Sequence, residues 1–172
     1  MRLIKTLNIA IALFVSQLTM AQNIDKKNTL KLNVIGIFFG DGNIGYERSL
    51  NSKNSIQFNT AFGLQNVDGV RYQMNALAFG YRYYFRGTTE TGWYVNPELG
   101  AARVLVKEGS LNFTSTGYLW RINGGWKRTY KNGFTLEFGA GIDGFGNNFE
   151  NKKYNLYNPI YPYLNTGIAY SF

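Results

Sequence analysis

The chain has 172 residues, enough for one domain, and a formal net charge of +8 at pH 7. It contains neither Cys nor His, which excludes a disulfide framework, a thiolate metal site and any reaction that depends on an imidazole. Aromatic residues make up 17%, and 20 Gly stand against 3 Pro, a composition that favours an all-β chain.

Residues 1–21 have the pattern of a secretory signal peptide. Two basic residues near the start precede an apolar run over 9–15, and small residues stand at the peptidase positions that end at Ala21. The apolar run is too short for a membrane-spanning helix, and an N-terminal core helix is the alternative. We expect the mature chain to begin with a polar periplasmic lead-in over 22–28.

Segments of alternating polarity, separated by turn-forming residues, follow along the rest of the chain. They predict eight strands, over residues 29–39, 44–50, 55–65, 72–85, 93–106, 112–126, 134–144 and 160–172. Residues 40–43 are a predicted tight turn. Pro97 cannot donate a ladder hydrogen bond, so we expect a bulge there.

The two faces of these segments differ in kind. Between residues 55 and 65, for example, Phe58 and Phe62 share one face, and Asn59 and Gly63 share the other. The small, sparsely charged face suits the narrow interior of an eight-stranded barrel better than a solvated exterior. Residues 29–172 therefore predict an all-β fold, an eight-stranded antiparallel up-and-down transmembrane β-barrel. A soluble secreted barrel with an apolar ligand inside is the alternative.

Charges of both signs fall on the predicted inner face. They are Glu47, Arg82, Glu98, Arg121 and Glu137, one on each of five strands and alternating in sign around the wall. An unpaired charge in a narrow lumen is costly, so we expect a paired network that plugs the barrel, with a gate or ion path as the alternative. Because Glu98 and Glu137 stand on both neighbouring strands, Arg121 is the predicted centre of this network.

The last predicted strand has one apolar, aromatic face and one face of small and polar residues. In this it resembles the closing strand of bacterial outer-membrane barrels. Its apolar face includes Leu164, Ile168, Tyr170 and Phe172. With segments 45–50, 80–85 and 92–100, the mature chain resembles the small OmpA/OmpX-type barrels, and more closely the OmpA-like barrels of Bacteroidetes. The resemblance implies the outer membrane of a Gram-negative bacterium, outer-membrane lipids around the barrel, and a barrel-assembly machinery that reads the closing strand.

No catalytic role is expected, and no metal or cofactor. Enzymes among outer-membrane barrels use a His, which this chain lacks, and no phosphate loop, metal cluster or nucleic-acid motif is present. Cations, Lys127 among them, gather at the predicted periplasmic end, which favours a lipid surface over nucleic acid as the partner, with simply solvated turn lysines as the alternative. In the longest connection, 145–159, the aromatic residues predict either a surface that binds an external glycan or protein, or a membrane-interface girdle that continues the strands. They are Phe145, Phe149, Tyr154 and Tyr157.

Overall fold

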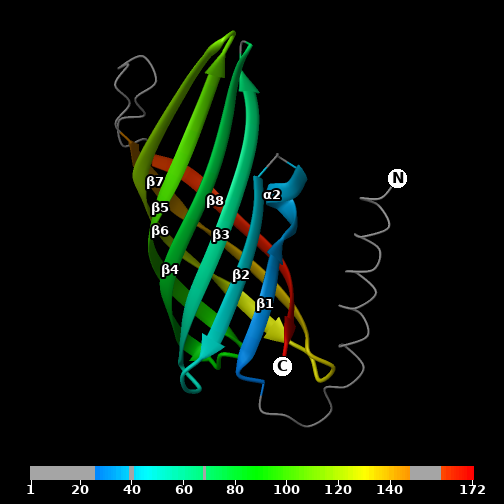
Figure 1. Ribbon diagram of the computed structural model, residues 1–172. Coiled ribbons are helices and arrows are strands. Elements are labelled where there is room, and N and C mark those ends of the chain that lie inside the picture. The colour runs from blue at the N-terminus through cyan, green and yellow to red at the C-terminus, as the bar shows by residue number, and fades with distance from the viewer. Residues whose placement is uncertain (1–25, 39–40, 68, 148–159) are drawn as a thin grey trace, which may run out of the picture.

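The computed structural model describes residues 26–38, 41–67, 69–147 and 160–172, which form a closed antiparallel barrel of eight strands in chain order (Figure 1). The strands are β1 (Asn28–Asn33), β2 (Asp41–Ser49), β3 (Asn54–Val67), β4 (Val70–Gly87), β5 (Thr91–Glu108), β6 (Leu111–Thr129), β7 (Phe134–Asn147) and β8 (Ile160–Ser171). The predicted fold class is confirmed in strand number, direction and order. The predicted signal peptide, residues 1–21, lies outside the described residues and stays a prediction.

β1 and β8 close the barrel over a short ladder. Thr29 pairs with Ser171 at one end of this ladder, and Asn33 pairs with Gly167 at the other. Just beyond the last residue of β8, the backbone groups of Phe172 exchange two hydrogen bonds of 2.9 and 2.8 Å with those of Asn28, the first residue of β1. We call this end of the barrel, where the C-terminus lies beside β1 in Figure 1, the terminal end, and the opposite end the far end.

The large apolar side chains point outward, as the alternation predicts. On β4 and β5, Leu77 and Leu99 are 65% and 71% exposed, whereas Tyr84 and Tyr94, inward residues of the same two strands, are 0% and 1% exposed. The other strands also alternate between outward and inward side chains, because successive residues of a strand point to opposite faces of the sheet. The barrel thus has an apolar exterior and an interior that is polar at the terminal end.

The first predicted strand, 29–39, is wrong beyond Asn33. Residues Val34–Phe38 form a short helix, α2, that contacts β2 and β8. The side-chain oxygen of Asn33 accepts a hydrogen bond from the backbone N–H of Gly36 at 3.3 Å, a local bond that competes with the sheet ladder. Apolar residues also fill both parities of this segment, so no alternation holds it in the wall.

Two smaller predictions are also wrong. In the described part of the predicted turn 40–43, residues 41–43 belong to β2 and pair with β3. No bulge lies at Pro97, because the β4–β5 ladder keeps one register from Glu98 to Val95. The register shift comes between Tyr84 and Arg86, next to the turn.

The inside of the barrel has two layers. The terminal half holds charged and hydroxyl side chains, described below. The far half holds an apolar cluster of mostly small residues from β4 to β7: Ala76, Ala78, Ala102, Val104, Val106, Leu119 and Phe145. The placement of Phe145 in a surface loop is wrong, because β7 extends to Asn147. The alternative, that this part of the connection continues the strand, is confirmed at Phe145, but its side chain points into the lumen with 7% exposure and not into an outer girdle.

Candidate functional site

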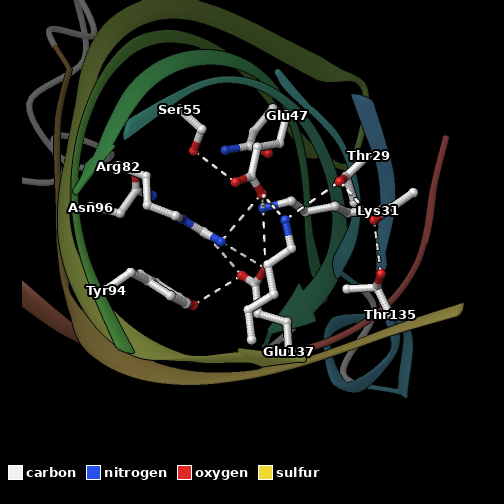
Figure 2. A network of polar contacts seen from close by, with 12 residues as sticks. Thr29, Lys31, Glu47, Ser55, Arg82, Tyr94, Asn96, Thr135 and Glu137 are labelled. Atoms are coloured by element: carbon white, nitrogen blue, oxygen red, sulfur yellow. Dashed lines mark hydrogen bonds and ion pairs between the residues drawn. The ribbon is translucent and has the colours of Figure 1, made fainter. Parts of the chain in front are cut away.

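Arg82 is the centre of the charged layer. From β4 its guanidinium reaches Glu137 on β7 through two hydrogen bonds of 2.8 Å, one to each carboxylate oxygen. It also lies 3.4 Å from a Glu47 oxygen on β2 and stacks over the Tyr94 ring at 3.6 Å. Figure 2 shows Arg82 and Glu137 pointing toward each other from different parts of the wall. A planar guanidinium fits a carboxylate in this two-bond geometry, which a lysine could not reproduce.

Two lysines complete the cluster around Arg82. Lys31 on β1 lies 2.6 Å from Glu47 and 3.1 Å from Glu137, and Lys127 on β6 lies 3.1 Å from Glu47. Neither lysine was among the predicted members of the network. Lys127 was placed in a turn because the predicted strand stopped at Trp126, yet it shares the inward parity of Arg121. Lys31 lies within the predicted strand 29–39 and shares the inward parity of Thr29, so the alternation already pointed to it. Finding Lys127 required extending the predicted strand 112–126 by one residue.

Uncharged donors satisfy the remaining carboxylate oxygens. Ser55 and Tyr84 donate their hydroxyls to Glu47 at 2.7 and 2.8 Å. The Tyr94 hydroxyl and the Asn165 amide donate to the same oxygen of Glu137, at 2.9 and 2.5 Å. Both carboxylates are therefore saturated by partners from several strands, which is what burying an ionised group requires.

Toward the terminal end, hydroxyl groups link the strands that close the barrel. Ser171 on β8 lies 2.8 Å from both the Thr29 and the Thr135 hydroxyl oxygens. Lys127 reaches this group too, with its ammonium 3.4 Å from the Thr29 hydroxyl. The Arg82 cluster is thus continuous with the β7–β8–β1 seam, as Figure 2 shows for Thr29 and Thr135.

Arg121 forms a second, separate cluster nearer the far end. It lies 3.4 Å from Glu98 and 3.0 Å from Asp143, and stacks on the Tyr163 ring at 3.7 Å. Its predicted pairing with Glu137 is wrong, because the β6–β7 register sets Arg121 opposite Asp143 and sets Lys127 opposite Glu137. The prediction that Arg121 is the centre of the network is therefore also wrong, and Arg82 holds that place.

The five predicted charges are all buried and ion-paired, in two clusters rather than one ring. With the three further members, the ion pairs of the described lumen join four cations and four carboxylates: Lys31, Arg82, Lys127 and Arg121 with Glu47, Glu137, Glu98 and Asp143. Because these cations and carboxylates are equal in number, their buried charges balance. Hydrogen-bond saturation differs between the clusters, because Arg121 Nε and the Oδ1 atoms of Asn96 and Asn123, beside Glu98, have no hydrogen-bond partner.

The closing strand presents its predicted apolar face to the outside at Leu164, Ile168 and Phe172, all more than 40% exposed. Tyr170 shares their parity but is buried, with its ring stacked on Phe172 and packed at the Gly133 turn. The other three aromatics of the predicted surface loop lie outside the described residues: Phe149, Tyr154 and Tyr157.

Within the described ranges, no group of three or more Asp, Glu, His or Cys side chains could hold a metal ion. No helix in the same part of the chain is long and apolar enough to cross a membrane. Comparison with protein-family models, curated proteins and solved structures finds no significant match.

Proposed function

We propose that this protein is an integral outer-membrane β-barrel with a plugged, salt-bridged lumen, which serves a structural or surface-interaction role without catalysis. The observation that carries the proposal is the inverted polarity of a closed barrel. Leu, Phe, Tyr and Trp side chains cover the outside, whereas Arg, Lys and Glu side chains are buried inside. Closed barrels of strands satisfy every backbone group within the wall, as a lipid environment requires.

A soluble barrel that carries an apolar ligand is the weaker reading. Such a protein would expose polar side chains on the outer face of its strands. Here the outer face of β4 carries Leu77, Phe79, Tyr81, Tyr83 and Phe85, each at least 44% exposed. A contiguous apolar surface of this kind is typical of contact with a membrane or a partner.

The proposed plug is supported by how completely side chains fill the terminal half. Arg82, Tyr84, Tyr94, Lys127 and Gln57 are the largest fully buried side chains of the described structure. Between the two charged clusters remains a cavity of about 20 Å³, lined among others by Arg82, Glu98 and Glu137. That volume is close to the minimum that a single water needs. A solute would therefore have to separate the Arg82–Glu137 pair in order to pass.

Lipid headgroups and the barrel-assembly machinery are the partners that this role implies. The turns and strand ends at the terminal end carry Lys53, Arg86, Arg128 and Lys131, which suit anionic headgroups of an inner leaflet. Lys127 does not belong to this group, because it is buried and paired with Glu47. An external glycan or protein ligand is part of the same proposal, as the surface-interaction role at the far end.

Membrane residence can be tested by fractionation of cells that express the full chain. We expect the protein in the outer-membrane fraction, soluble only with detergent. Its gel mobility should shift between unheated and heated samples, because a barrel resists detergent until it is heated. Release into the aqueous fraction without detergent would support the soluble barrel instead.

A further inference from the structure

The far half of the lumen contains a second, much larger cavity of about 590 Å³. This volume lies within the range of roughly 300–1,000 Å³ that small-molecule sites occupy. Its inner wall is apolar and comes from four neighbouring strands: Met74 and Ala76 on β4, Val104 on β5, Leu119 on β6 and Phe145 on β7. The Arg121–Asp143 pair lines it as well and separates it from the Arg82 cluster.

The barrel wall is interrupted beside this cavity. β1 ends at Asn33, and the β1–β8 ladder ends at the pair Asn33–Gly167, whereas β8 continues to Ile160. In the part of the chain that the structure describes, α2 takes the position of a longer β1 and contacts both β2 and β8. A five-residue helix cannot continue a ladder, so among the described residues no strand pairs with the edge of β8 beyond Gly167 on this side.

The cavity reaches through this interruption. Four consecutive residues of β8, Tyr161 to Leu164, line it, together with Ile35 and Gly36 of α2. A strand inside a continuous wall offers only every second side chain to the lumen. Leu164 has outward parity and is 61% exposed, so the cavity extends from the lumen around the edge of β8 to the outer face.

The charges of the lumen decide which part of an amphiphile fits. Arg121, the cation on the cavity wall, is already paired with Asp143 and Glu98, and cations and carboxylates balance over the described ion pairs. A charged head group would gain no free counter-ion there, and its desolvation would be uncompensated. A hydrocarbon chain gains the burial of apolar surface, at about 25 cal/mol per Å².

We propose that the far-end cavity accepts one acyl chain of a surrounding membrane lipid, which enters sideways between α2 and β8 while its head group stays outside. Side entry rests on the proposed membrane residence. The occupant is a lipid chain rather than a water-borne solute, because the mouth beside Leu164 is continuous with the apolar exterior that faces lipid.

The test uses the full barrel reconstituted in vesicles of phosphatidylcholine that carries a photoactivatable diazirine on one acyl chain. After illumination, mass spectrometry locates the labelled residues. We expect label on the lumen residues Met74, Val104 and Leu119 as well as on outward residues such as Leu77 and Leu99. Label on the outward residues alone would overturn the acyl-chain site and leave membrane residence standing. Label on neither set would overturn membrane residence, and side entry with it.

A cavity-filling variant sharpens the result. Ala76→Phe places a ring in the cavity and should bring lumen labelling down to background while outward labelling persists. Ala101→Phe is the matched control, because Ala101 points outward on β5, directly opposite Leu77. It should change neither set. If Ala76→Phe does not assemble, Val104→Phe fills the same cavity from the neighbouring strand. Unchanged lumen labelling in an assembled filling variant would overturn the proposal.

Discussion

The guanidinium of Arg82 and the carboxylate of Glu137 meet across the lumen, from β4 to β7, through two hydrogen bonds of 2.8 Å. They are not ladder neighbours, because three strand interfaces separate them in the wall. The pair therefore links two parts of the wall that no backbone ladder joins directly. Lys31, Lys127 and Glu47 surround it with further ion pairs of 2.6–3.4 Å.

Replacing Arg82 with Ala should be strongly destabilising. Removal of one partner from a buried ion pair costs about 3–5 kcal/mol, because the remaining charge keeps its desolvation penalty. The measurement is urea unfolding of the refolded barrel, followed by tryptophan fluorescence. Arg86→Ala is the matched control, since Arg86 is exposed on the same strand, and its cost should be small. Equal midpoints for the two variants would contradict the central role of Arg82.

Arg121→Ala should cost clearly less than Arg82→Ala. The Asp143 side chain is 21% exposed and retains some solvent, and the Arg121–Glu98 distance is a long 3.4 Å. The unpartnered polar atoms beside Glu98 also indicate an incompletely satisfied cluster. The same urea titration compares the loss of stability in the two variants. A larger loss of stability for Arg121→Ala would show that Arg121, and not Arg82, is the centre of the network.

The inward and outward parity of the strands could be predicted from the sequence, and with it the burial of all five charges. Which charges meet could not be predicted, because the stagger between strands sets which residues come level across the lumen. The alternation over residues 134–144 places Glu137 and Asp143 on the same face of the strand. It does not say which of them lies level with Arg121 along the barrel axis. β1 ended early for a different reason, because the local Asn33–Gly36 hydrogen bond and the apolar residues on both parities override a strand pattern.

Gly139 should not tolerate even a methyl group. A Cβ there would lie 2.9 Å from the Tyr94 hydroxyl and 2.9 Å from the Gly124 carbonyl oxygen. Gly139→Ala should therefore push Tyr94 away from Glu137 and cost about 1–3 kcal/mol. Gly167→Ala is the control on the next strand, where the nearest atom to an added Cβ is 3.6 Å away. Equal stability of the two variants in thermal unfolding would show that Tyr94 is not confined by Gly139.

The native barrel should show no steady conductance in planar bilayers. Buried side chains fill the terminal half, and the Arg82–Glu137 pair crosses it. In this half the lumen keeps little more space than its side chains occupy, with a cavity of only about 20 Å³ beside Arg82, Glu98 and Glu137. The double variant Arg82→Ala with Glu137→Ala removes the crossing pair without leaving either partner charged, and brief openings are expected from it. A stable, ion-selective current from the native protein would favour a gate over a plug.

Phe172 should matter for assembly through its side chain as well as its backbone. Its backbone N–H and C=O bond to Asn28 at 2.8 and 2.9 Å and close the barrel, while its ring is 44% exposed on the outer face. Phe172→Ala keeps the backbone bonds and removes the ring that an assembly machinery would read. We expect a lower yield of the heat-shifted band in cells, with normal refolding in detergent. Phe134→Ala is the matched control, since Phe134 pairs with Tyr170 at the same end and is 41% exposed. Equal yields in cells for both variants would show that the closing strand is not recognised through its last side chain.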